Sequence, residues 1–210
     1  MRWPRIVAYA AFSTGLLLSC IAYAQQTVIF GFERSWVEAK ADLKAYEEVF
    51  FRNIDLRDLH LKVHDIDGEL VKDRFSADAM QQIAFAIFRS FADPLDGIID
   101  VNMEELKAKD LKEKNLLVID LKVSGTYVVE EERLLMKVIK GSAKPSLALT
   151  FEGSVVDGAT DKALATFEDT KDIVDLSDTP FENAEDLEKL SAALDQWASY
   201  LKDFLWKKRK

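Results

Sequence analysis

The segment that decides the fold is LALTFEGSVVDGATDKALATFED, residues 147–169. In its first arm the apolar side chains fall at odd positions, which is the period of a strand with one buried face. These residues are Leu147, Leu149, Phe151 and Val155. The connection DGATDK, residues 157–162, is rich in turn residues, and a second arm runs from Ala163 to Asp169. The segment therefore predicts a β-hairpin.

Further strands are predicted on the N-terminal side of this hairpin. Residues 116–130 form a long run with the composition of a strand, and β-favouring residues dominate Val49 to Asp55. Between these segments, Leu59, Leu61 and Val63 alternate with polar residues. This alternation predicts a strand that is buried on one face only.

Two amphipathic helices are predicted, because apolar residues recur at steps of three and four. The first begins after the N-cap Ser76 and is expected to end at Asp93-Pro94, since proline disfavours helix in the residue before it. The second begins after Asn183 and presents one apolar face. That face consists of Leu187, Leu190, Leu194, Trp197, Leu201 and Phe204.

These elements predict an α+β fold in the order β-β-α-β-β-β-α. The sheet is expected to be mainly antiparallel, with two amphipathic helices packed on one face. Three parts of the chain are expected: a signal peptide at residues 1–24, an irregular lead-in at 25–45 and a single α+β domain at 46–210. One domain is expected because no repeat, low-complexity tract or long linker follows residue 24.

The N-terminus has the layout of a bacterial secretory signal, with two early arginines before an uncharged run from Ile6 to Ala24. Three ways of processing it stay open. A signal peptidase could cleave after Ala24, since Ala22 and Ala24 supply small residues before the cut. Alternatively, Cys20 could be lipidated and hold the protein on a membrane, or the run could remain as an uncleaved anchor. Each alternative places the domain outside the cytoplasm, in the periplasm or anchored to a membrane.

The chain is acidic, with 37 Asp and Glu against 28 Lys and Arg and a formal net charge of −9. Such a surface repels phosphate backbones, so nucleic acid is not an expected partner. Cys20 is the only cysteine and lies in the signal, so the exported domain is expected to have no disulfide. Its stability must come from a core for which 13 Phe and 4 Trp are available.

Few residues suggest a chemical site. His60 and His64 would lie on one face of a strand roughly 13 Å apart, which is too far for them to share a metal ion. Residues 65–69, DIDGE, resemble part of a calcium loop, but Ser76 stands where that loop needs a bidentate Glu, so a turn is expected. No nucleophile motif or phosphate loop appears. No catalytic, cofactor-binding or metal-binding residue, and no cofactor, is predicted.

The C-terminal segment Trp206–Lys210 places four basic residues after an aromatic one. These residues could contact anionic lipid or an acidic partner. The preferred interpretation is favourable charge at the C-terminus of a helix.

Residues 147–165 resemble the hairpin of an uncharacterised family of exported bacterial proteins, domain of unknown function 3313. In that family a final helix carries a pattern similar to Leu-Asp-x-Trp-Ala-x-x-Leu, as at residues 194–201 here. The resemblance covers about residues 116–206, and more loosely Tyr46 to Asp93. It implies the fold and an exported location, often as a lipoprotein, and it carries over no catalytic residue.

The expected function is that of an exported bacterial envelope protein that acts as a non-enzymatic interaction or structural domain. Its expected partners are envelope proteins or components of the cell wall or membrane. One alternative is a periplasmic domain that binds a small molecule or a lipid between the sheet and the helices. A less favoured alternative is a hydrolase that uses a pair of carboxylates.

Overall fold

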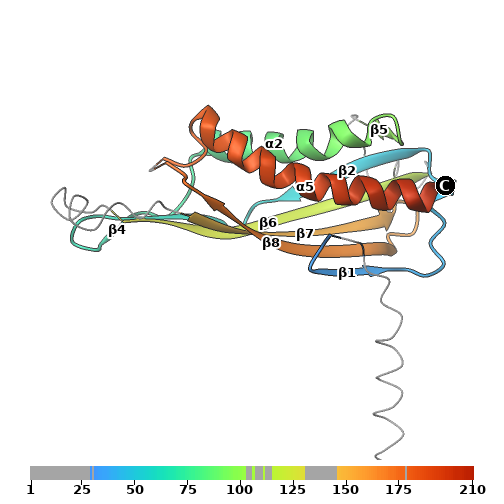
Figure 1. The fold of residues 1–210 in the computed structure, drawn as a ribbon, viewed down its shortest axis with the longest axis horizontal. Coiled ribbons are helices and arrows are strands. Elements are labelled where there is room, and N and C mark those ends of the chain that lie inside the picture. The colour runs from blue at the N-terminus through green and yellow to red at the C-terminus, as the bar shows by residue number, and fades with distance from the viewer. Residues whose placement is uncertain are drawn as a thin grey trace, which may run out of the picture.

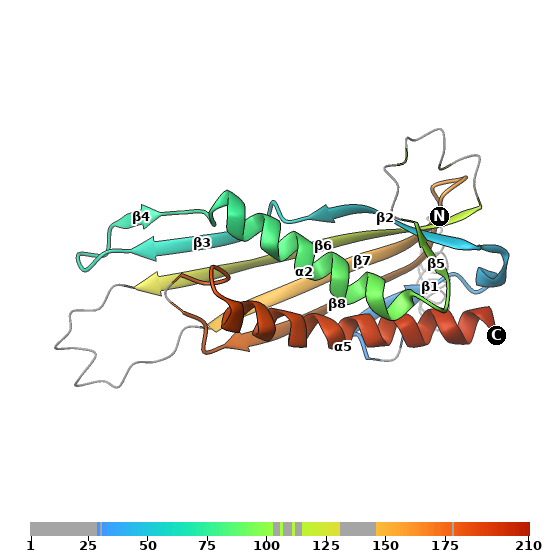
Figure 2. The same cartoon turned by 90° about the horizontal axis from the view of Figure 1, so that it is seen from above.

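The structure is a computed structural model that describes residues 29, 31–102, 106, 111, 115–130, 146–177 and 179–210. Within these residues eight strands form one sheet, and two long helices lie on one of its faces (Figure 1). Seen from the helix side, one end of the sheet extends beyond both helices (Figure 2). The predicted α+β class, with both helices on one face, is confirmed.

The strands have the following bounds: β1 Arg34–Val37, β2 Glu48–Asp55, β3 Leu59–His64, β4 Leu70–Lys72, β5 Asp100–Asn102, β6 Leu116–Glu130, β7 Ser146–Asp157 and β8 Ala163–Val174. The helices are α2 Ala77–Leu95 and α5 Ala184–Arg209, and a short 3-10 helix, η2, spans Leu43–Ala45. Both predicted N-caps are confirmed. Ser76 Oγ accepts a hydrogen bond from Ala79 N at 3.1 Å, and Asn183 Oδ1 accepts one from Asp186 N at 2.8 Å.

Strand β6 organises the sheet because it pairs with three other strands. Its first half lies between β2, which is parallel to it, and β7, which is antiparallel. Its second half pairs with β3 in parallel, and β3 carries β4. On the other side β7 pairs with β8, and β8 carries the edge strand β1. The sheet is therefore mixed. Among its three longest strands, β7 runs antiparallel to both β6 and β8.

Three features of the sheet and helices differ from the sequence-based expectation. Strands β1, β4 and β5 have only three or four residues, too few to show an alternation. Strand β1 and the 3-10 helix lie in the segment 25–45 that was expected to be irregular. Helix α2 continues past Asp93 to Leu95 and includes Pro94. The helix tolerates this proline because its last turn is still closed by a 3.1 Å hydrogen bond from Asp96 N to Ala92 O.

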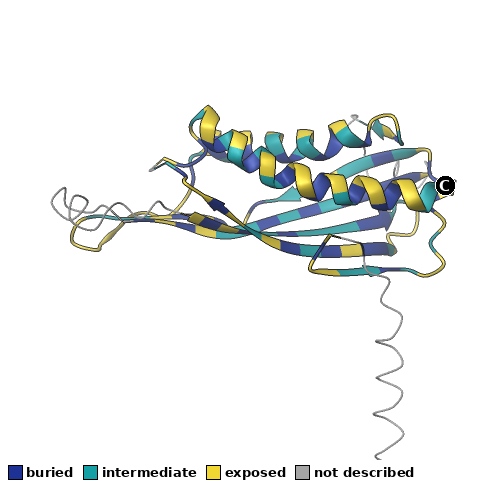
Figure 3. Ribbon diagram, in the orientation of Figure 1, coloured by how far each residue is buried: buried dark blue, intermediate teal, exposed yellow. Residues whose placement is uncertain are grey.

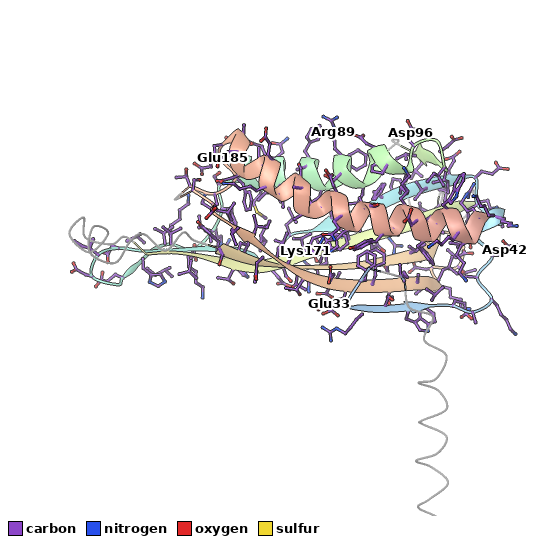
Figure 4. The ribbon with its side chains drawn as sticks, viewed as in Figure 1. Glu33, Asp42, Arg89, Asp96, Lys171 and Glu185 are labelled. Atoms are coloured by element: carbon purple, nitrogen blue, oxygen red, sulfur yellow. The ribbon has the colours of Figure 1, made fainter. Side chains whose placement is uncertain are left out.

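Aromatic rings fill the space between the sheet and the helices. Phe91 of α2 stacks on Phe151 of β7 with 4.9 Å between ring centroids, and Phe151 stacks on Trp197 of α5 at 4.7 Å. Lys171 also lies in this layer, with its Nζ 4.9 Å from the centre of the Trp197 ring (Figure 4). Buried residues line the sheet-facing sides of both helices (Figure 3). These stacked rings lie in the layer where the sequence suggested that a ligand pocket could form.

Candidate binding site

A row of charged side chains crosses the face of the sheet opposite the helices. The strand register aligns Arg34 of β1, Glu168 of β8, Glu152 of β7, Lys122 of β6 and Asp55 of β2. Registered residues on neighbouring strands point to the same face and lie about 5 Å apart. The row therefore extends across five strands, over roughly 19 Å.

A second row runs beside the charged row, two residues along each strand. It contains Trp36, Thr166, Ser154, Asp120 and Asn53. Trp36 and Asn53 occupy its two ends and Asp120 lies next to Asn53, whereas the positions on β8 and β7 carry the short hydroxyl side chains of Thr166 and Ser154. Long side chains thus surround short ones on this face.

The two rows line a hollow of about 470 Å³. Its floor is low because Ser154 and Thr166 are short. On the inner side of the floor the ring of Phe167 lies against Gly153, where an added Cβ atom would overlap that ring. Glycine at this position lets the ring fill the core directly beneath the hollow.

Ion pairs connect the charged row across neighbouring strands. Arg34 pairs with Glu168, and Lys122 Nζ lies 3.3 Å from Glu152 Oε1 and 3.0 Å from Asp58 Oδ2. At the β2 end, Arg52 Nε donates a 3.0 Å hydrogen bond to Asp120, and Arg57 Nε donates one of 2.9 Å to Asp55. The charged groups are thereby held in a defined arrangement across the sheet.

Several of these pairs move the pKa of one member further from neutral pH. Hydrogen bonds from Arg57 lower the pKa of Asp55 to about 2. Hydrogen bonds to carboxylate partners raise the pKa of Lys122 and of Arg52 above their ordinary values. General acid–base catalysis works best with a group whose pKa lies near the working pH. The arrangement is therefore better suited to recognition through charge and hydrogen bonds than to proton transfer.

The two predicted histidines lie on β3 and do not line the hollow. His64 Nδ1 lies 3.2 Å from Gly68 O. The neighbouring acidic segment is a turn, as predicted, in which Asp65 accepts hydrogen bonds from the backbone of Asp67 and Glu69 at 3.0 and 2.9 Å. Among the described residues, no group of three or more His, Cys, Asp or Glu is placed to hold a metal ion.

The basic C-terminal segment packs against the domain. Arg209 Nη1 donates a 3.2 Å hydrogen bond to Leu43 O and another to Tyr46 O. Lys210 Nζ lies 4.4 Å from the centre of the Trp206 ring. The two hydrogen bonds of Arg209 attach the end of α5 to η2 and the residue that follows it.

The residues of the predicted signal, Cys20, Ala22 and Ala24, lie outside the described residues. In the part of the chain that is described, no helix is both long and apolar enough to cross a membrane.

A second, different surface lies between the two helices. A groove of about 530 Å³ there is lined by residues such as Phe85, Arg89 and Asp195. Phe85 is 61% exposed, and Arg89 lies over its ring at 5.9 Å. This groove is lined by helix residues and lacks the registered rows of the opposite face.

Comparisons with known proteins find distant structural matches. No family model matches the sequence, and no curated protein matches it either. A homologue of a neuraminyllactose-binding hemagglutinin from Helicobacter pylori is 13% identical over 82% of this chain and 93% of its own, with a TM-score of 0.42. A Xanthomonas campestris protein of domain of unknown function 330 is 12% identical over 78% and 85%, also with a TM-score of 0.42. The PelC dodecamer of Paraburkholderia phytofirmans is 14% identical over 84% and 95%, with a TM-score of 0.33.

At these identities and TM-scores, none of the similar structures supports a function for this chain. The resemblance to domain of unknown function 3313 is not confirmed, because no family model matches. The candidate site therefore depends on its own geometry.

Sequence reasoning did not find the hollow. Its lining comes from five strands, and the register that aligns them cannot be read from the sequence. The one available signal was the polar half of each alternating strand, such as Lys122 and Glu152. That pattern indicates a solvent-facing side of the sheet without showing which polar residues meet.

Proposed function

We propose that this chain is an exported, non-enzymatic binding protein of the bacterial cell envelope. Its ligand binds in the hollow on the helix-free face of the sheet. One observation carries the proposal: the helices cover one face, and the opposite face holds a 470 Å³ hollow between two ordered rows of polar side chains. Binding pockets for small ligands are concave, occupy roughly 300–1,000 Å³ and contain a few well-placed polar groups.

The lining favours a polar ligand over a lipid chain. Arg34, Lys122, Glu152 and Glu168 all line the hollow, together with hydroxyl side chains. A hydrocarbon chain placed there would remove these charges from water without replacing their hydrogen bonds, which is unfavourable. On the other side of the sheet, Phe91, Phe151 and Trp197 stack on one another, as expected of a filled core.

The location in the envelope is supported by the N-terminal sequence. An uncharged run after two arginines, ending in Ala22-Tyr23-Ala24, is the pattern of an exported bacterial protein. We take cleavage after Ala24 as the proposed processing, which gives a periplasmic protein. Lipidation of Cys20 would hold the same binding face at a membrane instead. Envelope proteins and components of the cell wall or membrane are the proposed partners.

Site-specific photocrosslinking in the native host tests this proposal. A photoreactive amino acid replaces Thr166, which is exposed in the hollow, and in a control chain it replaces Gln82, which is exposed on α2. Crosslinked adducts of increased mass are expected with the probe at Thr166 and not at Gln82. Equal adduct formation at both positions, or none at Thr166, would refute binding in the hollow.

A further inference from the structure

We infer that the hollow binds a short neutral oligosaccharide, with Trp36 as the surface on which one sugar ring stacks. This inference rests on the proposed function and names its ligand class. It depends on three properties of the lining: an accessible aromatic ring, closely spaced donors and acceptors, and an excess of negative charge.

The aromatic ring is supplied by β1. Trp36 and Phe167 are the two aromatic residues that line the hollow. Phe167 is only 3% exposed, whereas Trp36 is partly exposed, so Trp36 is the ring that a ligand can contact. One face of a sugar ring consists largely of C–H groups, and such a face packs well on an indole, which combines a large apolar surface with a polar N–H.

The polar groups of the hollow match a ligand with many hydroxyl groups. Arg34 and Lys122 can only donate hydrogen bonds, the carboxylates of Glu152 and Glu168 accept them, and the hydroxyl of Ser154 does both. A sugar hydroxyl also donates and accepts, so neighbouring hydroxyls of one ring can satisfy both kinds of group. The rows extend over roughly 19 Å, which suits several linked rings better than one.

The charge of the lining argues against anionic ligands. Four carboxylates and two basic side chains line the hollow, and their ion-pair partners beside it add Arg52, Arg57, Asp58 and Asp161, so an excess of two negative charges remains. A phosphate or uronate group entering it would meet net repulsion, because like charges at close range oppose association. Phosphorylated glycans, anionic lipids and polyuronates are therefore disfavoured. A neutral sugar chain avoids this repulsion and can still hydrogen-bond to the polar groups of the lining.

Calorimetric titration of the exported part of the chain, residues 25–210, tests this inference with three probes. N,N′,N″-triacetylchitotriose and maltotriose are neutral trisaccharides, and trigalacturonate is an anionic one of similar length. At least one neutral trisaccharide is expected to bind saturably, and trigalacturonate is expected to bind at least about tenfold more weakly. The change in intrinsic tryptophan fluorescence on binding, which is expected to be absent in Trp36→Ala, provides a second measurement of the same binding.

Substitutions of tryptophan locate the binding in the hollow. Trp36→Ala is expected to weaken the association by about tenfold, and Trp36→Phe, which keeps a ring, by less. Trp206→Ala is the matched control, because Trp206 is 45% exposed but lies on α5, on the other side of the sheet. Circular dichroism verifies that all three variants are folded.

Several outcomes would overturn the inference. They are equal binding of the anionic and neutral probes, equal loss in Trp36→Ala and Trp206→Ala, or no binding of either neutral trisaccharide at about 10 mM. Crosslinks from Thr166 without saccharide binding would overturn the ligand class and leave the proposed function standing. Absence of those crosslinks would overturn both.

Discussion

The indole Nε1 of Trp197 donates a 2.6 Å hydrogen bond to Asp169 Oδ2, and both side chains are buried between β8 and α5. Trp197 stacks on Phe151 with the same ring, so one residue links an aromatic stack to a buried carboxylate. A buried polar group without a partner is costly, and a charged one more so. This bond therefore helps to fix the position of α5 on the sheet.

Trp197→Phe is expected to lower the free energy of unfolding by about 2–4 kcal/mol, because the buried carboxylate loses this donor. Asp169→Asn keeps an oxygen that can accept from the indole and is expected to cost about 1 kcal/mol. Urea unfolding followed by circular dichroism measures both. A larger loss in Asp169→Asn than in Trp197→Phe would contradict this account.

The hydrogen bond between Tyr46 and Asp157 predicts a pH dependence at high pH. Tyr46 Oη donates to Asp157 Oδ2 at 2.6 Å, and burial together with this bond raises the pKa of Tyr46 above its ordinary value of 10. The unfolded chain therefore loses the phenolic proton first. The stability that Tyr46 contributes is complete below pH 10 and is lost as the pH rises above it.

Tyr46→Phe should consequently show a shallower fall in stability above pH 10 than the native chain, at a cost of about 1 kcal/mol near neutrality. Asp157 acts in the opposite direction. Burial opposes its ionisation, but the hydrogen bonds from Tyr46, Thr160 and Ala159 keep its pKa below the ordinary value. Its contribution is present above about pH 4 and is lost in acid. Thermal unfolding of the native chain, Tyr46→Phe and Asp157→Asn across pH measures both slopes, and identical slopes would contradict the assignment.

Asp186 is expected to be among the most sensitive polar residues of the chain. It is 1% exposed and accepts hydrogen bonds from Ser177, Phe181 and Asn183 at the start of α5. Asp186→Ala leaves these donors without their acceptor and is expected to cost about 2–4 kcal/mol. Glu185→Ala, whose side chain is 78% exposed, is the control and is expected to change stability by less than about 0.5 kcal/mol. Similar losses in the two variants, measured by chemical denaturation, would refute the assignment.

Gly153→Ala tests the close packing beneath the hollow. The added methyl group overlaps the ring of Phe167, and the expected cost is about 1–3 kcal/mol through overpacking. Phe167→Leu in the same chain should recover part of this loss, so the two effects should not be additive. Ser154→Ala, on the opposite side of the floor, is the control with little effect on stability. Additive losses in the double variant would show that the ring is not the cause.

The mass of the mature N-terminal peptide tests the proposed export. A peptide that begins at Gln25 in the soluble envelope fraction is the expected result of cleavage after Ala24. Acylated Cys20 in the membrane fraction would replace this proposal with a lipid anchor. An intact Met1 in the cytoplasmic fraction would refute export altogether.

The sequence predicted those elements whose local pattern is long or ends at a distinct residue. The strand Leu116–Glu130 was predicted with both of its bounds, because its fifteen residues form one long run with the composition of a strand. Ser76 and Asn183 located the helix starts because short polar side chains there satisfy free backbone N–H groups. Short edge strands have no such pattern. The parallel direction of β2 and β3 was also missed, since alternation is the same in both directions.

The candidate site was beyond sequence reasoning for a different reason. Its rows form only when Arg34, Glu168, Glu152, Lys122 and Asp55 are aligned across five strands. A shift of one residue in any strand would turn that side chain to the other face. The polar character of the face can be predicted strand by strand, but the hollow requires the register of the whole sheet.

The central place of β6 has a consequence for how the chain folds as it is exported, N-terminus first. Glu48 of β2 pairs with Leu116, and Leu59 of β3 pairs with Gly125, so both strands must wait for more than sixty later residues. Contacts between such distant parts of a chain form slowly, and unpaired strands are prone to aggregate meanwhile. Until β6 emerges, the β2–β5 pair and the β3–β4 pair have no strand that joins them. A chaperone that holds the emerging chain would therefore be needed most before Leu116 appears and least once β6 is complete.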